Sequence, residues 1–115
     1  MRIITKSDAT KERVLGVTER TRRPSHPGAL LRAIIEEMGW SQGEFAARIG
    51  VSRRTINEVL VGRRPLSPDL AHRVGRLLGN GAGFWIRFQN QRDTWDALHM
   101  DTQIYEAIEP IRKAA

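Results

Sequence analysis

Residues 41–60 read SQGEFAARIGVSRRTINEVL, and they predict two short helices joined by a tight turn. Ser41 suits the N-cap of the first helix, and Glu44 three residues later completes a capping box. Gly50 stands where the chain reverses, because a residue without Cβ adopts the left-handed conformation at little cost. Ser52 suits the N-cap of the second helix. Local signals alone therefore place both helices and the turn between them.

The apolar residues of this stretch fall on one face of each helix. They are Phe45, Ala46 and Ile49 in the first helix and Ile56, Val59 and Leu60 in the second. The other face of the second helix begins with Arg53 and Arg54 and continues with Asn57 and Glu58. This arrangement is typical of a helix-turn-helix, whose second helix enters the major groove of DNA with its first residues facing the bases.

Helical patterns flank the pair on both sides. A helix is expected to begin at Pro27, because proline fits the first turn, and to end at Gly39. Another begins with the N-cap, proline and acid at residues 67–69 and ends at Gly79. A fifth is expected over about residues 84–98, and a short one lies within residues 102–111. No β-type alternation of any length occurs, so the chain is predicted to be all-α.

Three regions are predicted along the chain. Residues 1–23 form a basic arm that is expected to be flexible, residues 24–98 the helix-turn-helix domain, and residues 99–115 a C-terminal tail with a short helix. The simplest interpretation of the arm is a solvated tail. The alternative is that its arginines contact phosphate or a minor groove. The candidates for such contacts are Arg20, Arg22 and Arg23.

The charge of the chain favours a polyanionic partner. The net charge is +6 and the isoelectric point is about 11. Residues 1–23 carry +4 and residues 24–79 carry +3, whereas residues 80–115 carry −1. Cysteine is absent, which suits a reducing cytosol and removes thiolate metal sites. No apolar run approaches the ~20 residues of a membrane span, and no signal peptide is recognisable, so a cytoplasmic protein without a membrane partner is expected.

The chain resembles phage-repressor-like helix-turn-helix proteins, and over about residues 24–98 it is similar to HigA-type antitoxins. The motifs that carry the resemblance are His26-Pro27-Gly28, Trp40-Ser41-Gln42, Ile56-Asn57-Glu58, Gly62-Arg63-Arg64, and Phe84-Trp85 followed by Gln89 and Asp93. The chain departs from the family at Arg92, where an aromatic residue is usual, and at Thr94, where an aliphatic residue is usual. The resemblance implies a five-helix, lambda-repressor-like DNA-binding domain with a short C-terminal helix.

The resemblance also implies a function. Proteins of this kind form homodimers, bind a palindromic operator in their own promoter, and repress their operon. They also neutralise a cognate toxin, a HigB-like protein that cleaves messenger RNA on the ribosome. A stand-alone dimeric repressor of the same fold, without a toxin partner, is the first alternative. An RNA-binding accessory protein that uses its charge without reading sequence is the second.

The predicted DNA contacts lie around the second helix of the pair. Arg53, Arg54 and Asn57 are predicted to read bases, since arginine can donate two parallel hydrogen bonds to guanine. Asn57 fits an internal contact to the neighbouring turn equally well, and Glu58 is expected to position an arginine. Phosphate contacts are predicted at helix starts and just past the second helix. These residues are Gln42, Ser52, Thr55, Arg63 and Arg64.

A single module touches few base pairs, so a dimer is expected, with reading helices about 34 Å apart. The dimer contact is predicted on the fifth helix, at Trp85, Phe88 and Trp95, although core filling is at least as good an interpretation of Trp85. The three histidines have no metal-ligand spacing, and no phosphate loop or nucleophile elbow is present. We therefore expect neither an enzyme nor a cofactor or metal site.

Overall fold

The computed structural model describes residues 22–112, and every regular element in that range is an α-helix. The helices are α2 (Pro27–Met38), α3 (Gln42–Ile49), α4 (Arg53–Leu60), α5 (Pro68–Leu78), α6 (Ala82–His99) and α7 (Gln103–Glu106). The all-α prediction is confirmed. The predicted arm lies outside the described residues except for its last two, Arg22 and Arg23.

The helix ends follow the predicted caps closely. The Oγ atom of Ser41 accepts a hydrogen bond from the N–H of Glu44 at 3.0 Å, and Ser67 caps α5 in the same way. Gly50 ends α3 with φ at 74°, a left-handed conformation that a Cβ would strain. Because each capping residue bonds to a backbone group within four positions of itself, the helix ends could be predicted from the local sequence.

The core lies between α2, α3, α4 and α5 and is closed by the first half of α6. Its largest fully buried side chains are Trp85, Phe45, Leu31, Ile56 and Leu66. Gly28 allows α2 to approach α4 closely, because a Cβ at this position would lie 2.1 Å from the carbonyl oxygen of Val59. The backbone of α4 therefore lies directly against the first turn of α2.

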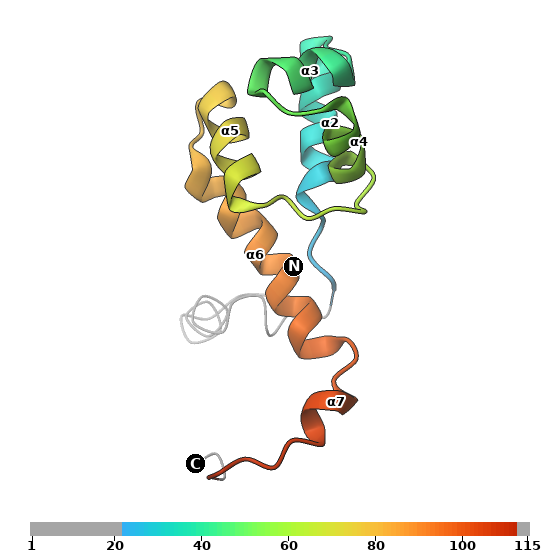
Figure 1. Cartoon of the computed structure of the whole chain (residues 1–115), viewed down its shortest axis with the longest axis vertical. Helices are drawn as coiled ribbons and strands as arrows, with labels where there is room; N and C mark the ends of the chain where they lie inside the picture. Colours follow the sequence, from blue (N-terminus) through green and yellow to red (C-terminus); the bar gives the residue numbers. More distant parts are fainter. Residues whose placement is uncertain (1–21, 113–115) are drawn as a thin grey trace, which may run out of the picture.

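Helix α6 is longer than predicted, since it begins at Ala82 and ends at His99. Its first half packs on α5, where Gly75 meets the backbone of Gly81 with no room for a Cβ. Its second half runs past the helical body towards α7, as Figure 1 shows. Most large apolar side chains that are exposed in the described residues gather at this end: Leu98, Met100, Ile104, Tyr105, Ile108 and Ile111.

Candidate DNA-binding surface

The start of α4 carries a compact hydroxyl pair. The Oγ atom of Ser52 accepts a hydrogen bond from the N–H of Thr55 at 3.1 Å and lies 2.9 Å from the Thr55 hydroxyl oxygen. Ser52 thus occupies the predicted N-cap and fixes the first turn of α4. The cap leaves the beginning of this helix exposed, together with the two arginines that follow.

The two arginines at the start of α4 both point to solvent but differ in their partners. Arg53 is exposed, and its side chain forms no hydrogen bond or ion pair with any residue between 22 and 112. Arg54 is 89 % exposed at its side chain, and its Nε donates to Glu58 Oε1 at 3.2 Å one turn later. A pair this exposed contributes little to stability, so the Arg54 guanidinium remains available to another partner.

Asn57 lies against the neighbouring helix. Its Nδ2 donates to Gln42 Oε1 at 3.1 Å, which joins the middle of α4 to the first residue of α3. The contact is internal, like the alternative to base reading that the sequence left open, but it reaches α3 rather than the neighbouring turn. The bond also holds the Gln42 amide at the start of α3, where a phosphate contact is predicted.

The turn after α4 carries two further exposed arginines, Arg63 and Arg64. The N–H groups of Arg63 and Arg64 both donate to the carbonyl oxygen of Glu58, at 2.9 and 3.2 Å. The Arg64 guanidinium also reaches Glu58 Oε1 at 3.4 Å, and the Arg64 carbonyl oxygen lies 3.0 Å from His26 Nε2. Glu58 contacts both Arg54 and Arg64, as expected of a residue that positions an arginine.

One supporting residue was missed by the sequence analysis. Arg73 of α5 donates to the carbonyl oxygens of Ile49 and Gly50 at 2.8 and 3.4 Å, and so satisfies the C-terminal end of α3. Its spacing from Asp69 predicts the ion pair that the structure contains, at 2.9 Å. No local signal indicates the contact with α3, which lies more than 20 positions away.

The aromatic residues of α6 divide into core and partly exposed members. Trp85 is 0 % exposed, and its Nε1 donates to Asn80 Oδ1 at 2.9 Å. The prediction of Trp85 at a dimer interface is therefore wrong, because the ring fills the core and presents no surface. Phe88 stacks on Trp85 and is half-buried. Trp95 is half-buried too and stacks on His99 at 4.4 Å between ring centroids.

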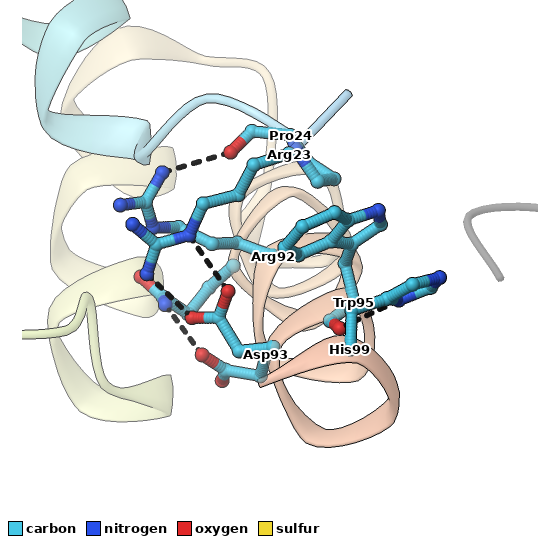
Figure 2. Close-up of polar contacts among 8 residues, drawn as sticks. Arg23, Pro24, Arg92, Asp93, Trp95 and His99 are labelled. Carbon is cyan, nitrogen blue, oxygen red and sulfur yellow. Dashed lines mark hydrogen bonds and ion pairs between the residues drawn. The ribbon is translucent and has the colours of Figure 1, made fainter. Parts of the chain in front are cut away.

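The segment before α2 is bound to α6, as Figure 2 shows. Arg23 donates from Nε and Nη2 to the two carboxylate oxygens of Asp96, at 2.7 and 2.8 Å. Arg92, which departs from the family pattern, donates to the carbonyl oxygen of Pro24 at 2.8 Å. Arg23 was assigned to the arm from sequence, yet the structure attaches it to the helical domain.

A buried amide joins α6 to the segment before α5. Gln89 is 6 % exposed, and its Oε1 accepts from the N–H of Leu66 at 2.8 Å. Its Nε2 donates to Asp93 Oδ1 at 2.9 Å. This pairing explains the Gln89 and Asp93 motif, whose role could not be read from the sequence.

Known proteins resemble this chain in both sequence and fold. The model of the family described as Helix-turn-helix matches residues 31–84. Antitoxin HigA-1 of Vibrio cholerae is 29 % identical over 91 residues, which span 78 % of this chain and 86 % of the relative. The antitoxin HigA of Pseudomonas aeruginosa, solved with the higBA promoter, is 34 % identical with a TM-score of 0.69. The match covers 78 % of this chain and all of that protein.

The chain belongs to the HigA-type helix-turn-helix family. A HigA-family antidote protein from Coxiella burnetii matches as well, with 25 % identity, a TM-score of 0.66, and coverage of 77 % and 99 % of the two chains. These family members are DNA-binding antitoxins and regulators rather than enzymes. The predicted lambda-repressor-like fold is confirmed by the same likeness.

Two other features of residues 22–112 bear on function. No group of three histidine, aspartate or glutamate side chains in this range could hold a metal ion. No helix there is long and apolar enough to cross a bilayer.

Proposed function

We propose that this HigA-type protein represses its own promoter by reading a palindromic operator with α4. The observation that carries the proposal is the pair Arg53 and Arg54, exposed side by side on the first turn of a capped helix. Guanidinium groups at this position of a helix-turn-helix face the base edges, where each can donate two bonds to guanine. The solved relative with its promoter makes DNA the expected partner here too.

The remaining predicted contacts act on phosphate. Arg63 and Arg64 lie just past α4 in an exposed turn, and Gln42 lies at the first turn of α3. Side chains and backbone N–H groups at such positions orient a protein on the duplex without reading sequence. Asn57 holds Gln42 through one N–H of its amide, and its second N–H and its Oδ1 are the groups that would read a base.

A dimer is required for an operator of useful length, because one module spans few base pairs. We assign the dimer contact to α6 at Phe88 and Trp95, since Trp85 is excluded by its burial. The exposed apolar side chains that follow Trp95 extend the same end of the molecule. Sedimentation velocity of the full chain tests dimerisation, with a two-subunit species as the expected result and a monomer as the contrary one, and the same measurement on Phe88→Ala and Trp95→Ala tests the assignment to α6, which predicts a shift towards monomer.

The second part of the proposal concerns a toxin. Family membership supports a cognate partner of the HigB kind, a ribosome-dependent messenger-RNA-cleaving enzyme that this protein binds and neutralises in the cytoplasm. Expression of the adjacent reading frame should arrest growth, and co-expression of this protein should restore growth and allow the two to be purified together. If co-expression does not restore growth but the protein still binds DNA, the result would favour the alternative, a stand-alone dimeric repressor.

The DNA-binding part has a direct test. Fluorescence anisotropy with a duplex from the upstream region should show binding at least tenfold tighter than with a scrambled duplex of the same composition. Equal affinity for the two duplexes would contradict sequence-specific repression. Equal affinity would instead favour the alternative of an RNA-binding protein that uses its charge without reading sequence. In that case an RNA hairpin of equal length should compete with the duplex for binding.

A further inference from the structure

The four residues before α2 form a strap, Arg23 to His26, that connects α6 with the DNA-binding half. Arg23 is bound to Asp96, and the Pro24 carbonyl oxygen accepts from Arg92. Pro24 itself is buried. The strap is therefore held at its first two residues before it reaches His26, as Figure 2 shows for the end at α6.

The His26 ring uses its two nitrogens in opposite directions. Nδ1 accepts from the N–H of Gly28 at 2.9 Å and caps α2. Nε2 lies 3.0 Å from the Arg64 carbonyl oxygen, which can only accept, so Nε2 must carry the proton. The ring is thus neutral and fixed in one tautomer. Burial, assisted by the charge of Arg92, lowers the pKa of His26 and favours this neutral form.

Arg64 is consequently fixed on both sides of its Cα atom. Its N–H is bound to the Glu58 carbonyl oxygen, and its own carbonyl oxygen is bound to His26. The bond to His26 connects the exposed turn of residues 61–65 to another part of the fold, 38 positions earlier in the chain. The Arg64 side chain meanwhile remains 44 % exposed, and its guanidinium is only loosely paired with Glu58, at 3.4 Å.

We propose that His26 is a positioning residue for DNA binding, which orders the turn after α4 so that Arg64 is presented to a phosphate. The inference rests on the proposed DNA-binding function. An exposed turn that is free in solution must be ordered when it binds, and this ordering lowers affinity. The His26 bond orders the turn in advance. The effect is independent of sequence, because a phosphate contact carries no base information.

The test is His26→Ser in the full chain. Serine is a good N-cap and can still accept from the N–H of Gly28, but it is too short to reach Arg64. Affinity should fall about three- to tenfold for upstream and scrambled duplexes alike, as expected for one lost hydrogen bond. His72→Ser is the matched control, because His72 is an exposed histidine on α5, and it should leave affinity unchanged. Wild-type affinity in His26→Ser would overturn the proposal.

A second measurement separates positioning from general damage to the fold. In an Arg64→Ala background, His26→Ser should lose at least half of its effect on binding, because the group it positions is absent. An undiminished effect would overturn the proposal. Binding to scrambled duplex reports this coupling even if the wild-type protein shows no preference for its upstream DNA. Failure of the proposed repressor function and failure of this inference are therefore distinguishable.

Discussion

Arg23 and Asp96 form a two-bond ion pair across 73 positions of sequence, with donor–acceptor distances of 2.7 and 2.8 Å. This parallel geometry is the strongest form of an arginine–carboxylate contact. Hydrogen bonding from Arg23 holds the pKa of Asp96 below its ordinary value, and the same bond raises the pKa of Arg23. The strap is thereby attached to α6 through a pair that depends on an ionised carboxylate.

The first prediction concerns Asp96→Ala and acid stability. A carboxyl whose pKa is lowered by folding stabilises the folded state above its unfolded pKa of 3.8, and loses this contribution as the pH falls through its folded pKa. Asp96→Ala should therefore lower the melting temperature slightly at pH 7, and the difference from wild type should vanish in strong acid. Glu37→Ala, at an exposed carboxylate on α2, is the control. A difference that does not depend on pH would contradict the ion pair.

The second prediction concerns the buried amide of Gln89. Gln89→Met keeps the volume of the side chain but leaves the N–H of Leu66 without its acceptor. An unsatisfied buried donor costs about 1–3 kcal/mol, so urea unfolding should report a loss of that size. Gln91→Met makes the same chemical change at an exposed position of α6 and should stay within about 0.5 kcal/mol of wild type. Equal effects of the two variants would argue against the bond to Leu66.

The third prediction concerns the close approach of α2 and α4. Gly28→Ala places a Cβ 2.1 Å from the Val59 carbonyl oxygen, so the helices must separate, at a cost of about 1–3 kcal/mol or more. Gly43→Ala adds the same methyl group to α3, where the nearest atoms are 3.9 Å away. That change should stabilise the protein by about 0.5–1 kcal/mol through helix propensity. Thermal unfolding should therefore show a lower melting temperature for Gly28→Ala and a higher one for Gly43→Ala than for wild type.

The fourth prediction concerns the proposed base reading by Arg53 and Arg54, as distinct from DNA binding that does not depend on sequence. Arg53→Ala or Arg54→Ala should reduce the preference for upstream over scrambled duplex, with about 1–3 kcal/mol lost per guanine contact. Weak, salt-sensitive binding should remain. Anisotropy titrations with both duplexes measure the ratio. If the ratio of the two affinities is the same as in wild type, the assignment of sequence reading to these arginines of α4 is wrong.

The fifth prediction concerns Arg63, whose guanidinium has no partner among residues 22–112. Arg63→Ala should weaken binding to every duplex by a similar factor and reduce the slope of log affinity against log salt by about 0.9, one phosphate contact. Titrations at several salt concentrations give this slope. A loss confined to one operator position would instead assign Arg63 to base reading.

The sequence by itself determined the elements and their order. Ser41, Gly50 and Ser52 act within a few residues of the groups they cap, so the boundaries of α3 and α4 could be predicted from local chemistry. The apolar stripes likewise indicated which face of each helix is buried. Because the exposed face of α4 follows from its buried face, the location of Arg53 and Arg54 could also be predicted.

Only the tertiary structure decided which of these exposed and apolar side chains meet. The burial of Trp85, the Asn57 bond to Gln42, and the bond of His26 to Arg64 depend on how the helices pack. The residues in these contacts are brought together where helix backbones approach closely, as Gly28 approaches Val59. The periodic pattern of apolar residues does not predict such approaches. Helical patterns specify faces within one element, whereas a contact between elements is specified by the shape of both surfaces.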